Sequence, residues 1–462
     1  MAADTQFIRT TARMLDYLNP AQKRLLGIEG LQVTERMVSH RFNHFAELVD
    51  PSVHHHPDKT EDEVTEAAAR LQDVCDRLCD ASVEEDMPEW SGDAALDGTL
   101  AECWGRKRKQ NYPDVLEPDP DAAWTGAKGG VFGYNIQYLT RIGPDGGGVI
   151  PQQVHRMTIG AASAVEHRLA LPLLTDMANR GVVGDLIFDR GYSGSTENFV
   201  EPARELGFEL TFDLNQNQRG RHGVTPQGAV LIDGFPHDPY TPDLWDEPES
   251  IHKNDGAGAR ATKYAEFEKR RRYALPTKGS RRADGAQQFF CPAEAGKVSC
   301  KLKPASVGQL RGLPIMAVPT VVPHLICGQK TVLIDAADMP LIQKHYYGSE
   351  DWWDSWKRRS MVELTNACVK DMASEKLRRG TNRFLGLAKF TLTVAFATAA
   401  MNLRLADSWR RGVEEAKTAG IAKVRRRKRR RTLAREAYSA AKAQGADFED
   451  RVAAASAARA GP

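Results

Sequence analysis

The sequence lacks an uninterrupted apolar stretch of the length needed to cross a membrane, which is about 20 residues. The longest candidate, 390–403, is bounded by Lys389 and Arg404, and we expect a core helix there. The N-terminus has no charged segment followed by an apolar one, so we expect no secretion signal. The seven cysteines in 462 residues form no dense framework. This scarcity favours a reducing, cytoplasmic setting over a disulfide-stabilised fold.

Charge of one sign is not in excess overall, but it is unevenly distributed. The formal net charge is +2, whereas residues 58–97 are acidic and 423–431 (KVRRRKRRR) are basic at every position but Val424. Such a run suggests a polyanionic partner. We expect the run to contact the DNA backbone in a salt-dependent way, and a solubilising or RNA-binding tail is the alternative. The predicted phosphate-binding residues are Lys423, Arg425, Arg426, Arg427 and Lys428.

Residues 1–90 are predicted to form a helical N-terminal domain. Thr34 is a candidate N-cap, and Met37, Phe42, Phe45 and Val49 follow it at helical spacing. Together with PAQKRLLG just before it, this helix could form a helix-turn-helix that reads DNA ends. Plain core helices are the alternative, to which we give slightly more weight.

A second helix is predicted over 61–80, with Val64, Ala68, Leu71, Cys75 and Leu78 on one face. Cys75 and Cys79 are four residues apart, but nearby histidine or cysteine ligands are lacking, so we interpret both as small core residues. The run His54-His55-His56-Pro57 resembles a ligand cluster. Its polar, proline-flanked setting favours a solvated loop.

From residue 91 to 215 the pattern changes to strands with intervening helices. The run DAALDGTL ends its apolar alternation on Asp97, and VFGYNIQYLT alternates Phe132, Tyr134, Ile136 and Tyr138 with smaller or polar residues. VIPQQVHRMTI could be the second arm of a hairpin. A helix around 172–180, the strand DLIF ending on Asp189, and a helix over 196–206 follow. The order predicts an α/β fold with a mixed sheet.

Residues 216–348 interrupt this order and are predicted to be a β-rich insertion. Helical patterns return in 349–410, and 411–462 is a basic and then Ala-rich tail. Within the insertion, Cys291, Cys300, His324 and Cys327 could hold a structural Zn²⁺. The wide spacing of the first pair and the loop around His324 favour free thiols instead.

Two carboxylates, Asp97 and Asp189, follow predicted strands, where they could meet around a divalent cation. A third acid could come from WKRRSMVELTNACVK. On a regular α-helix, Trp356, Arg359, Glu363 and Lys370 would share an arc of about 60°. An aromatic, two cations and a carboxylate make a poor core face and a good surface for metal and phosphate. Taken alone, an Asp after a strand is ordinarily part of a turn or a helix cap, and a Glu between Arg and Lys on a helix ordinarily lies on a solvated face. Asp119, Asp121 and Asp185 are nearby acids that could be mistaken for members of the metal site.

Taken together, ALDGTLAE, LIFDRGYSG and the helix above resemble the three blocks of bacterial insertion-sequence DDE transposases. The resemblance is to the group whose third block is Tyr-x2-Arg-x3-Glu-x6-Lys. Arg359, Glu363 and Lys370 match that spacing, and Trp356 stands at the tyrosine position. The segments DPDAAW and FFCPAEAGKVSC also resemble transposase segments, and the likeness runs from about residue 5 to 435.

The resemblance implies a ribonuclease-H-like catalytic core flanked by helices, in which Asp97, Asp189 and Glu363 hold two Mg²⁺ ions, with Mn²⁺ as a substitute. Two such ions can activate water and a DNA 3′-OH. Arg359 and Lys370 would bind phosphates. Trp356 can donate a hydrogen bond but cannot accept one, so a phosphate contact there would differ from that of tyrosine.

The implied activity is cleavage at the ends of an insertion sequence and strand transfer into target DNA. Double-stranded DNA, as terminal inverted repeats and target, is the expected partner, bound by a homodimer near the nucleoid and away from membranes. A ribonuclease-H-like nuclease without strand transfer and a retired transposase that only binds DNA are the alternatives.

Overall fold

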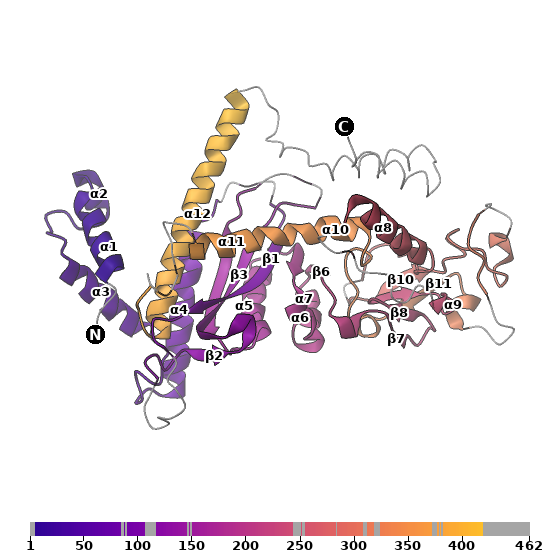
Figure 1. Ribbon diagram of the computed structural model, residues 1–462, viewed down its shortest axis with the longest axis horizontal. Coiled ribbons are helices and arrows are strands. Elements are labelled where there is room, and N and C mark those ends of the chain that lie inside the picture. Colours follow the sequence, from indigo (N-terminus) through magenta and orange to yellow (C-terminus); the bar gives the residue numbers. More distant parts are fainter. Residues whose placement is uncertain are drawn as a thin grey trace. The chain divides into compact units, whose positions relative to one another are not determined.

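The computed structural model describes most of the chain before residue 419 (Figure 1). The described residues are 5–84, 87, 90–106, 117–145, 147, 150–243, 251, 255–282, 284–307, 312–317, 324–371, 377, 379 and 382–418. The chain divides into two compact units. The first unit combines 1–144, 150–182 and 359–420, and the second includes 145–149 and 183–358. Each unit is described separately below.

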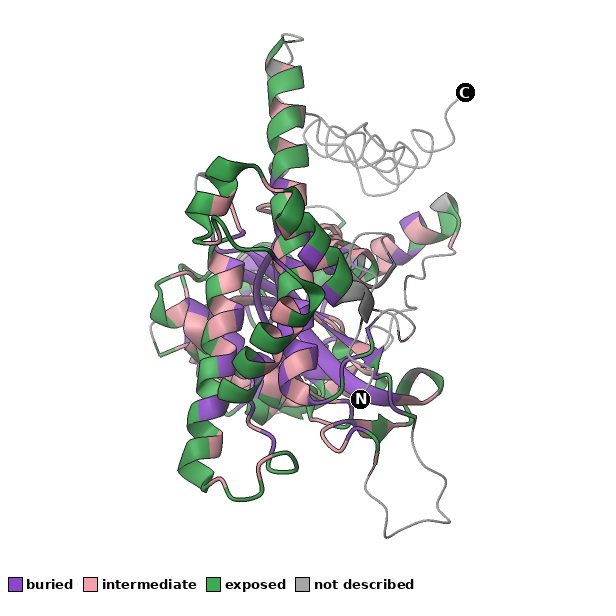
Figure 2. Ribbon diagram, turned by 90° about the vertical axis from the view of Figure 1, so that its left-hand side faces the viewer, coloured by how far each residue is buried: buried purple, intermediate pink, exposed green. Residues whose placement is uncertain are grey.

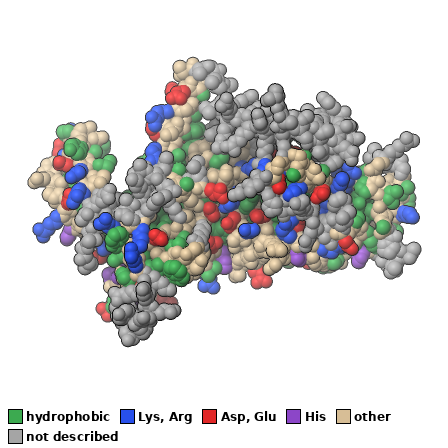
Figure 3. Space-filling model, viewed as in Figure 1, with side chains coloured by type: hydrophobic (Ala, Val, Ile, Leu, Met, Phe, Trp, Pro, Cys, Tyr) green, Lys and Arg blue, Asp and Glu red, His purple; other side chains and the backbone are tan. Residues whose placement is uncertain are grey.

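The first unit begins with helices α1 (Thr5–Tyr17), α2 (Pro20–Leu25), α3 (Glu35–Leu48) and α4 (Glu61–Asp80). Thr34 caps α3, as predicted, by accepting a hydrogen bond from the Met37 N–H at 3.2 Å. Thr60 and Glu63 form a capping box at the start of α4. Basic, acidic and apolar side chains all appear on the surface of α1–α3 (Figure 3). Large apolar side chains exposed there include Tyr17 and Leu25.

The predicted 61–80 helix has the bounds expected, and its buried face includes the predicted Leu71 and Cys75 but has Ala67 and Cys79 in place of Ala68 and Leu78. Ala67, Leu71, Cys75 and Cys79 are buried, whereas Ala68 is exposed. The core assignment of the two cysteines is confirmed, and burial raises the pKa of the Cys75 thiol to about 12. Leu71 packs with Ala388 and Leu392 of the last helix.

The sheet of the first unit is built around β3 (Val131–Arg141), which forms antiparallel pairs with β1 (Ala94–Glu102), β2 (Ala123–Thr125) and β4 (Val154–Ala161). The predicted hairpin of β3 and β4 is confirmed. From Phe132 to Arg141 every residue of β3 is buried, and Figure 2 shows the buried strands behind more exposed helices. Both strand faces are therefore covered, and the polar pair Asn135 and Gln137 is joined by a hydrogen bond of 2.9 Å.

Helices α5 (Glu166–Asn179), α11 (Ser360–Asp371) and α12 (Leu387–Thr418) complete the first unit. α4, α5 and α12 contact β4, and α11 contacts β1 and β3. α12 includes the predicted core helix 390–403, of which Phe390, Leu392 and Val394 are buried. Within the described residues, no helix has the length and apolarity needed to cross a membrane.

The second unit contains the parallel pair β5 (Asp185–Phe188) and β6 (Glu209–Phe212). They are joined by α6 (Arg190–Ser193), a π-helical turn (Thr196–Val200) and α7 (Glu201–Glu205). The strand DLIF and a helix after it are as the sequence predicts, whereas β6 was not predicted. Phe188 stacks on Phe212, with ring centroids 4.9 Å apart, and Phe199 meets Phe188 edge-on. The aromatic contacts bury the crossover against its strands.

The rest of the second unit has two small sheets and several helices. β7 (Arg221–Val224), β8 (Val230–Ile232) and β9 (Phe235–His237) form one antiparallel sheet, and β10 (Gln287–Phe290) pairs with β11 (Thr331–Ile334). The helices are α8 (Ala257–Arg271), α9 (Leu325–Gly328) and α10 (Glu350–Trp356). α8 is not anticipated by the prediction of a β-rich insertion. Overall, the predicted mixed α/β class is confirmed.

Candidate functional site

Asp97 lies in the middle of β1, opposite Tyr138 of β3. The expectation that the strand ends at Asp97 is wrong, because pairing with β3 continues to Glu102. The Asp97 side chain is 16% exposed, and its Oδ2 accepts a hydrogen bond of 2.9 Å from Asn366 Nδ2 of α11. Asp97 is therefore a partly accessible carboxylate on the sheet, facing α11.

Arg359 links Asp97 to Glu363. Its Nη2 lies 2.5 Å from Glu363 Oε1, one helical turn along the chain, and its Nη1 lies 3.8 Å from Asp97 Oδ1. Glu363 is 56% exposed, whereas Arg359 is 19% exposed. The structure therefore brings together three predicted site residues of the first unit, two carboxylates and the guanidinium that contacts both.

Asn366 is a site residue that the sequence prediction missed. It contacts Asp97 through Nδ2, while its Oδ1 is buried and lacks a hydrogen-bond partner among the described residues. An amide oxygen is a hard donor of the kind that Mg²⁺ accepts. The signal was present, because Asn366 follows Glu363 by three residues and so lies on the same side of α11.

Asp189 lies in the second unit, directly after β5. Its Oδ1 accepts a hydrogen bond of 2.9 Å from the Gly191 N–H, so it caps the short helix α6. The turn is held by buried Ser193, whose hydroxyl contacts the Asp213 carbonyl at 3.0 Å, and by Gln218, which donates to the Ser193 carbonyl at 2.6 Å. The capping role is the ordinary interpretation of an acid after a strand. It fixes the backbone that carries the Asp189 carboxylate.

The third predicted block is not one regular α-helix. A 3₁₀ turn at Lys357–Arg359 separates α10 from α11. The expectation of one regular α-helix from Trp356 to Lys370 is therefore wrong. In the second unit, Trp356 stacks on buried Trp352, with ring centroids 5.5 Å apart. Lys370 is in the last turn of α11, and its side chain lies outside the description.

The competing acids have structural partners. Asp119 is buried and accepts a hydrogen bond of 2.9 Å from the Tyr134 hydroxyl. In the second unit, Asp185 contacts Lys344 at 2.7 Å and Arg358 at 2.5 Å. The predicted phosphate-binding run Lys423, Arg425, Arg426, Arg427 and Lys428 lies outside the described residues.

The four residues considered for zinc do not form one ligand group. Cys291, Cys300 and Cys327 are buried in one apolar cluster of the second unit as free thiols, and burial raises the pKa of Cys327 to about 12. His324 is exposed and packs against Gly228. Their ligand atoms do not all lie within 4.8 Å of one another. The geometry therefore agrees with the free-thiol alternative.

A different group in the first unit could hold a metal ion. Ligand atoms of Asp50, His55 and Asp121 all lie within 4.8 Å of one another. His55 and His56 belong to the histidine run that the sequence analysis interprets as a solvated loop. The segment is a loop in which His54 and His55 are exposed, as that interpretation expects, and His55 and His56 also approach Asp50. The five-residue separation of Asp50 and His55 was a weak signal, and Asp121 had none.

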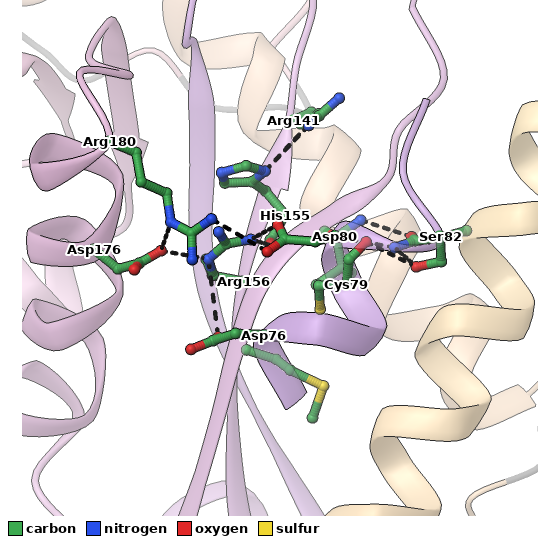
Figure 4. A network of polar contacts seen from close by, with 12 residues as sticks. Asp76, Cys79, Asp80, Ser82, Arg141, His155, Arg156, Asp176 and Arg180 are labelled. Carbon is green, nitrogen blue, oxygen red and sulfur yellow. Dashed lines mark hydrogen bonds and ion pairs between the residues drawn. The ribbon is translucent and has the colours of Figure 1, made fainter. Parts of the chain in front are cut away.

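A second set of perturbed ionisable groups lies under β4 (Figure 4). Arg156 is fully buried and contacts Asp80 at 2.7 Å and Asp176 at 2.5 Å. Burial, with the neighbouring guanidinium groups of Arg156 and Arg141, lowers the pKa of His155 to about 2. Perturbed groups often mark active sites. Here the burial of Arg156 and His155 inside the first unit indicates a structural network.

No protein-family model, curated protein or solved structure matches this chain.

Proposed function

We propose that this protein is a DDE-type transposase with a ribonuclease-H-like core, which cuts the ends of its insertion sequence and joins them to target DNA. The observation that carries the proposal is the Asp97, Arg359 and Glu363 arrangement. Asp97 comes from β1 and Glu363 from α11, far apart in sequence, and Arg359 contacts both. Two of the three blocks that resemble the transposase family thus meet at one place in the first unit.

The donor set fits a hard divalent cation. Asp97, Glu363 and Asn366 offer oxygen ligands, which suit Mg²⁺, and Asn366 Oδ1 has no hydrogen-bond partner in the part of the chain that the structure describes. Asp189 is the third carboxylate that the resemblance supplies. When bound, Mg²⁺ would provide Lewis-acid stabilisation of phosphate oxygens. Arg359 would then donate hydrogen bonds to the DNA phosphate as well as to a carboxylate, because a guanidinium can bind the two groups through different N–H groups.

The test uses a plasmid that carries this gene with its native flanks, incubated with purified protein and Mg²⁺, with breaks mapped at nucleotide resolution. Wild type is compared with Asp97→Asn, Asp189→Asn and Glu363→Gln. Glu197→Gln, an exposed residue at the start of the π-helical turn, is the matched control. We expect breaks at two fixed positions flanking the gene, lost in the three site variants and kept in the control.

Strand transfer is tested by supplying pre-cut ends with a free 3′-OH and a target plasmid. Joined products would support the transposase. Scattered breaks without joined products would favour a nuclease on the same fold. Cleavage that persists in Asp189→Asn would refute the assignment of that residue, and DNA binding without any breaks would favour a retired transposase.

A further inference from the structure

The group formed by Asp50, His55 and Asp121 has the dimensions of a transition-metal site. His55 Nδ1 lies 3.0 Å from Asp50 Oδ2 and 3.8 Å from Asp121 Oδ2. Tetrahedral coordination with bonds of about 2.0–2.1 Å places neighbouring ligand atoms about 3.3 Å apart. The two measured separations lie on either side of that value. The two carboxylates also offer ligand oxygens within 4.8 Å of one another, so side-chain shifts of about 1 Å would let all three residues share one ion.

The surrounding contacts hold the carboxylates in place. Asp50 Oδ1 accepts the Ser52 N–H at 3.0 Å, and Asp121 Oδ1 accepts a hydrogen bond from the Ser52 hydroxyl. Asp121 Oδ2 accepts the Leu387 N–H at 2.9 Å. The Asp50 and Asp121 side chains are 11% and 8% exposed. Supporting hydrogen bonds of this kind orient metal ligands before the ion binds.

Gly386 permits the close approach of the last helix to this group. Its φ is +91°, and a Cβ there would lie 2.5 Å from His55 Cε1. A side chain at this position would push the imidazole away from the two carboxylates. The site is therefore assembled from three distant segments, namely the loop after α3, the turn before β2 and the start of α12.

His56 supplies an independent observation. Its Nε2 is buried and lacks a hydrogen-bond partner among the described residues. The nearest carboxylate atom recorded for it, Asp50 Oδ2, is 3.6 Å away, which is beyond hydrogen-bond distance. A buried nitrogen without a hydrogen-bond partner lowers the stability of the folded state. A cation bound to Asp50 would remove this cost, because His56 Nε2 could then bind the ion as an additional ligand.

We propose that Asp50, His55 and Asp121 bind a structural divalent transition-metal ion, best matched by Zn²⁺, that fastens the loop after α3 to the turn before β2, which in turn holds the start of α12 through the Leu387 N–H. An imidazole with two carboxylates suits Zn²⁺ better than Mg²⁺ or Ca²⁺, which prefer oxygen ligands alone. The site is separate from Asp97 and needs no DNA. In the competing explanation, Asp50 and His55 form a simple ion pair and Asp121 is a helix cap.

The experiment uses the full-length, untagged chain carrying Asp97→Asn, so that a metal at the proposed catalytic site does not contribute. After treatment with a chelator and its removal, Zn²⁺ and Mg²⁺ are titrated by calorimetry and thermal unfolding is followed. His55→Gln is the test variant. His54→Gln is the matched control, because it changes an exposed histidine of the same loop.

We expect one tightly bound Zn²⁺ per chain, a rise in Tm of several degrees, and at least tenfold weaker binding in His55→Gln. His54→Gln should bind as the parent does, and Mg²⁺ should not substitute. Equal Zn²⁺ affinity in the two histidine variants would overturn the proposal.

A spectroscopic measurement keeps the proposal testable if His55→Gln fails to fold. Co²⁺ bound to the parent protein should show the intensified visible absorption of a low-coordinate site with nitrogen and oxygen ligands. The spectrum of hydrated Co²⁺ alone would overturn the proposal. Because neither readout uses DNA cleavage, the result is independent of whether the transposase assignment holds.

Discussion

Asn402 forms both backbone hydrogen bonds of Val154. Its Oδ1 accepts the Val154 N–H at 2.8 Å, and its Nδ2 donates to the Val154 carbonyl at 2.9 Å. A side chain of α12 thus supplies what a neighbouring strand would supply to β4. Asn402 is fully buried, so water cannot replace it.

Replacing Asn402 by leucine should therefore lower the free energy of unfolding by about 2–4 kcal/mol, because two buried backbone groups lose their partners. Urea unfolding followed by circular dichroism measures the loss. The control is Leu403→Ala, which changes a side chain that is 55% exposed on the same helix. A similar loss in both variants would show that the Asn402 contacts contribute nothing specific.

Removal of the buried Arg156 should be among the most destabilising charge changes in the first unit. Arg156→Met leaves Asp80 and Asp176 without their shared partner, and such losses cost about 3–5 kcal/mol. Arg77→Gln is the comparison, because its ion pair with Asp73 joins side chains that are 78% and 56% exposed. Exposed pairs contribute below about 1 kcal/mol. Chemical denaturation of the two variants should separate them clearly, and equal losses would contradict the structural role of the network.

Stability should fall as the pH drops below about 6.5, partly because of His155. Its pKa is lowered to about 2 in the folded protein, against about 6.5 in the unfolded chain. The unfolded state therefore binds the additional proton, and folding stability is fully present above pH 6.5 and is lost toward acid. The His155 contribution to the slope approaches about 1.4 kcal/mol per pH unit.

The measurement compares unfolding free energies of wild type and His155→Gln between pH 8 and pH 5. The two curves should run parallel above pH 7.5, where His155 is neutral in both states, and converge below pH 6. Parallel curves over the whole range would mean that the folded protein accommodates the charged imidazole.

Arg359 is expected to be needed for DNA cleavage and not for folding. Arg359→Ala removes the group that contacts both Asp97 and Glu363, and we expect plasmid cleavage to fall by about 100-fold, as for other electrostatic groups of active sites. Arg359→Lys should recover only part of the cleavage activity, because it keeps the positive charge but its single ammonium cannot bind two groups as a guanidinium does. Arg271→Ala, which breaks an exposed ion pair of α8, is the control. Unchanged cleavage in Arg359→Ala would contradict its place in the site.

The sequence predicted elements whose signals are local. The bounds of α4 follow from its capping box and its apolar periodicity, and DLIF from its apolar run. The end of β1 was missed because Asp97-Gly98 resembles a turn, whereas tertiary pairing with β3 carries the strand through it. α5 was expected to begin at Pro172, but it begins at Glu166 and contains the proline. α8 was missed because its surroundings are rich in glycine, proline and charge.

Residues of the sites were predictable only where a local pattern carried them. The Arg359 and Glu363 contact is a four-residue helical spacing, and the structure has it. The meeting of Asp121 with Asp50 depends on a fold that brings two distant turns together, and no periodicity in one sequence encodes it. Trp352 and Trp356 are also four residues apart, a spacing that brings side chains together on a helix. Their stacking was not predicted, because the resemblance assigned Trp356 to the binding of a DNA phosphate.

The division of the first unit into three chain segments has a consequence for protein synthesis. A nascent chain that ends at residue 358 has β1, β4 and the loop after α3, but it lacks α11 and α12. Asp97 would then be without Arg359, Val154 without Asn402, and Asp121 without the Leu387 N–H. A truncated translation product would therefore lack Arg359 and Glu363 of the candidate catalytic site and the Leu387 contact that supports Asp121, so both candidate sites are complete only after α11 and the start of α12 have been synthesised.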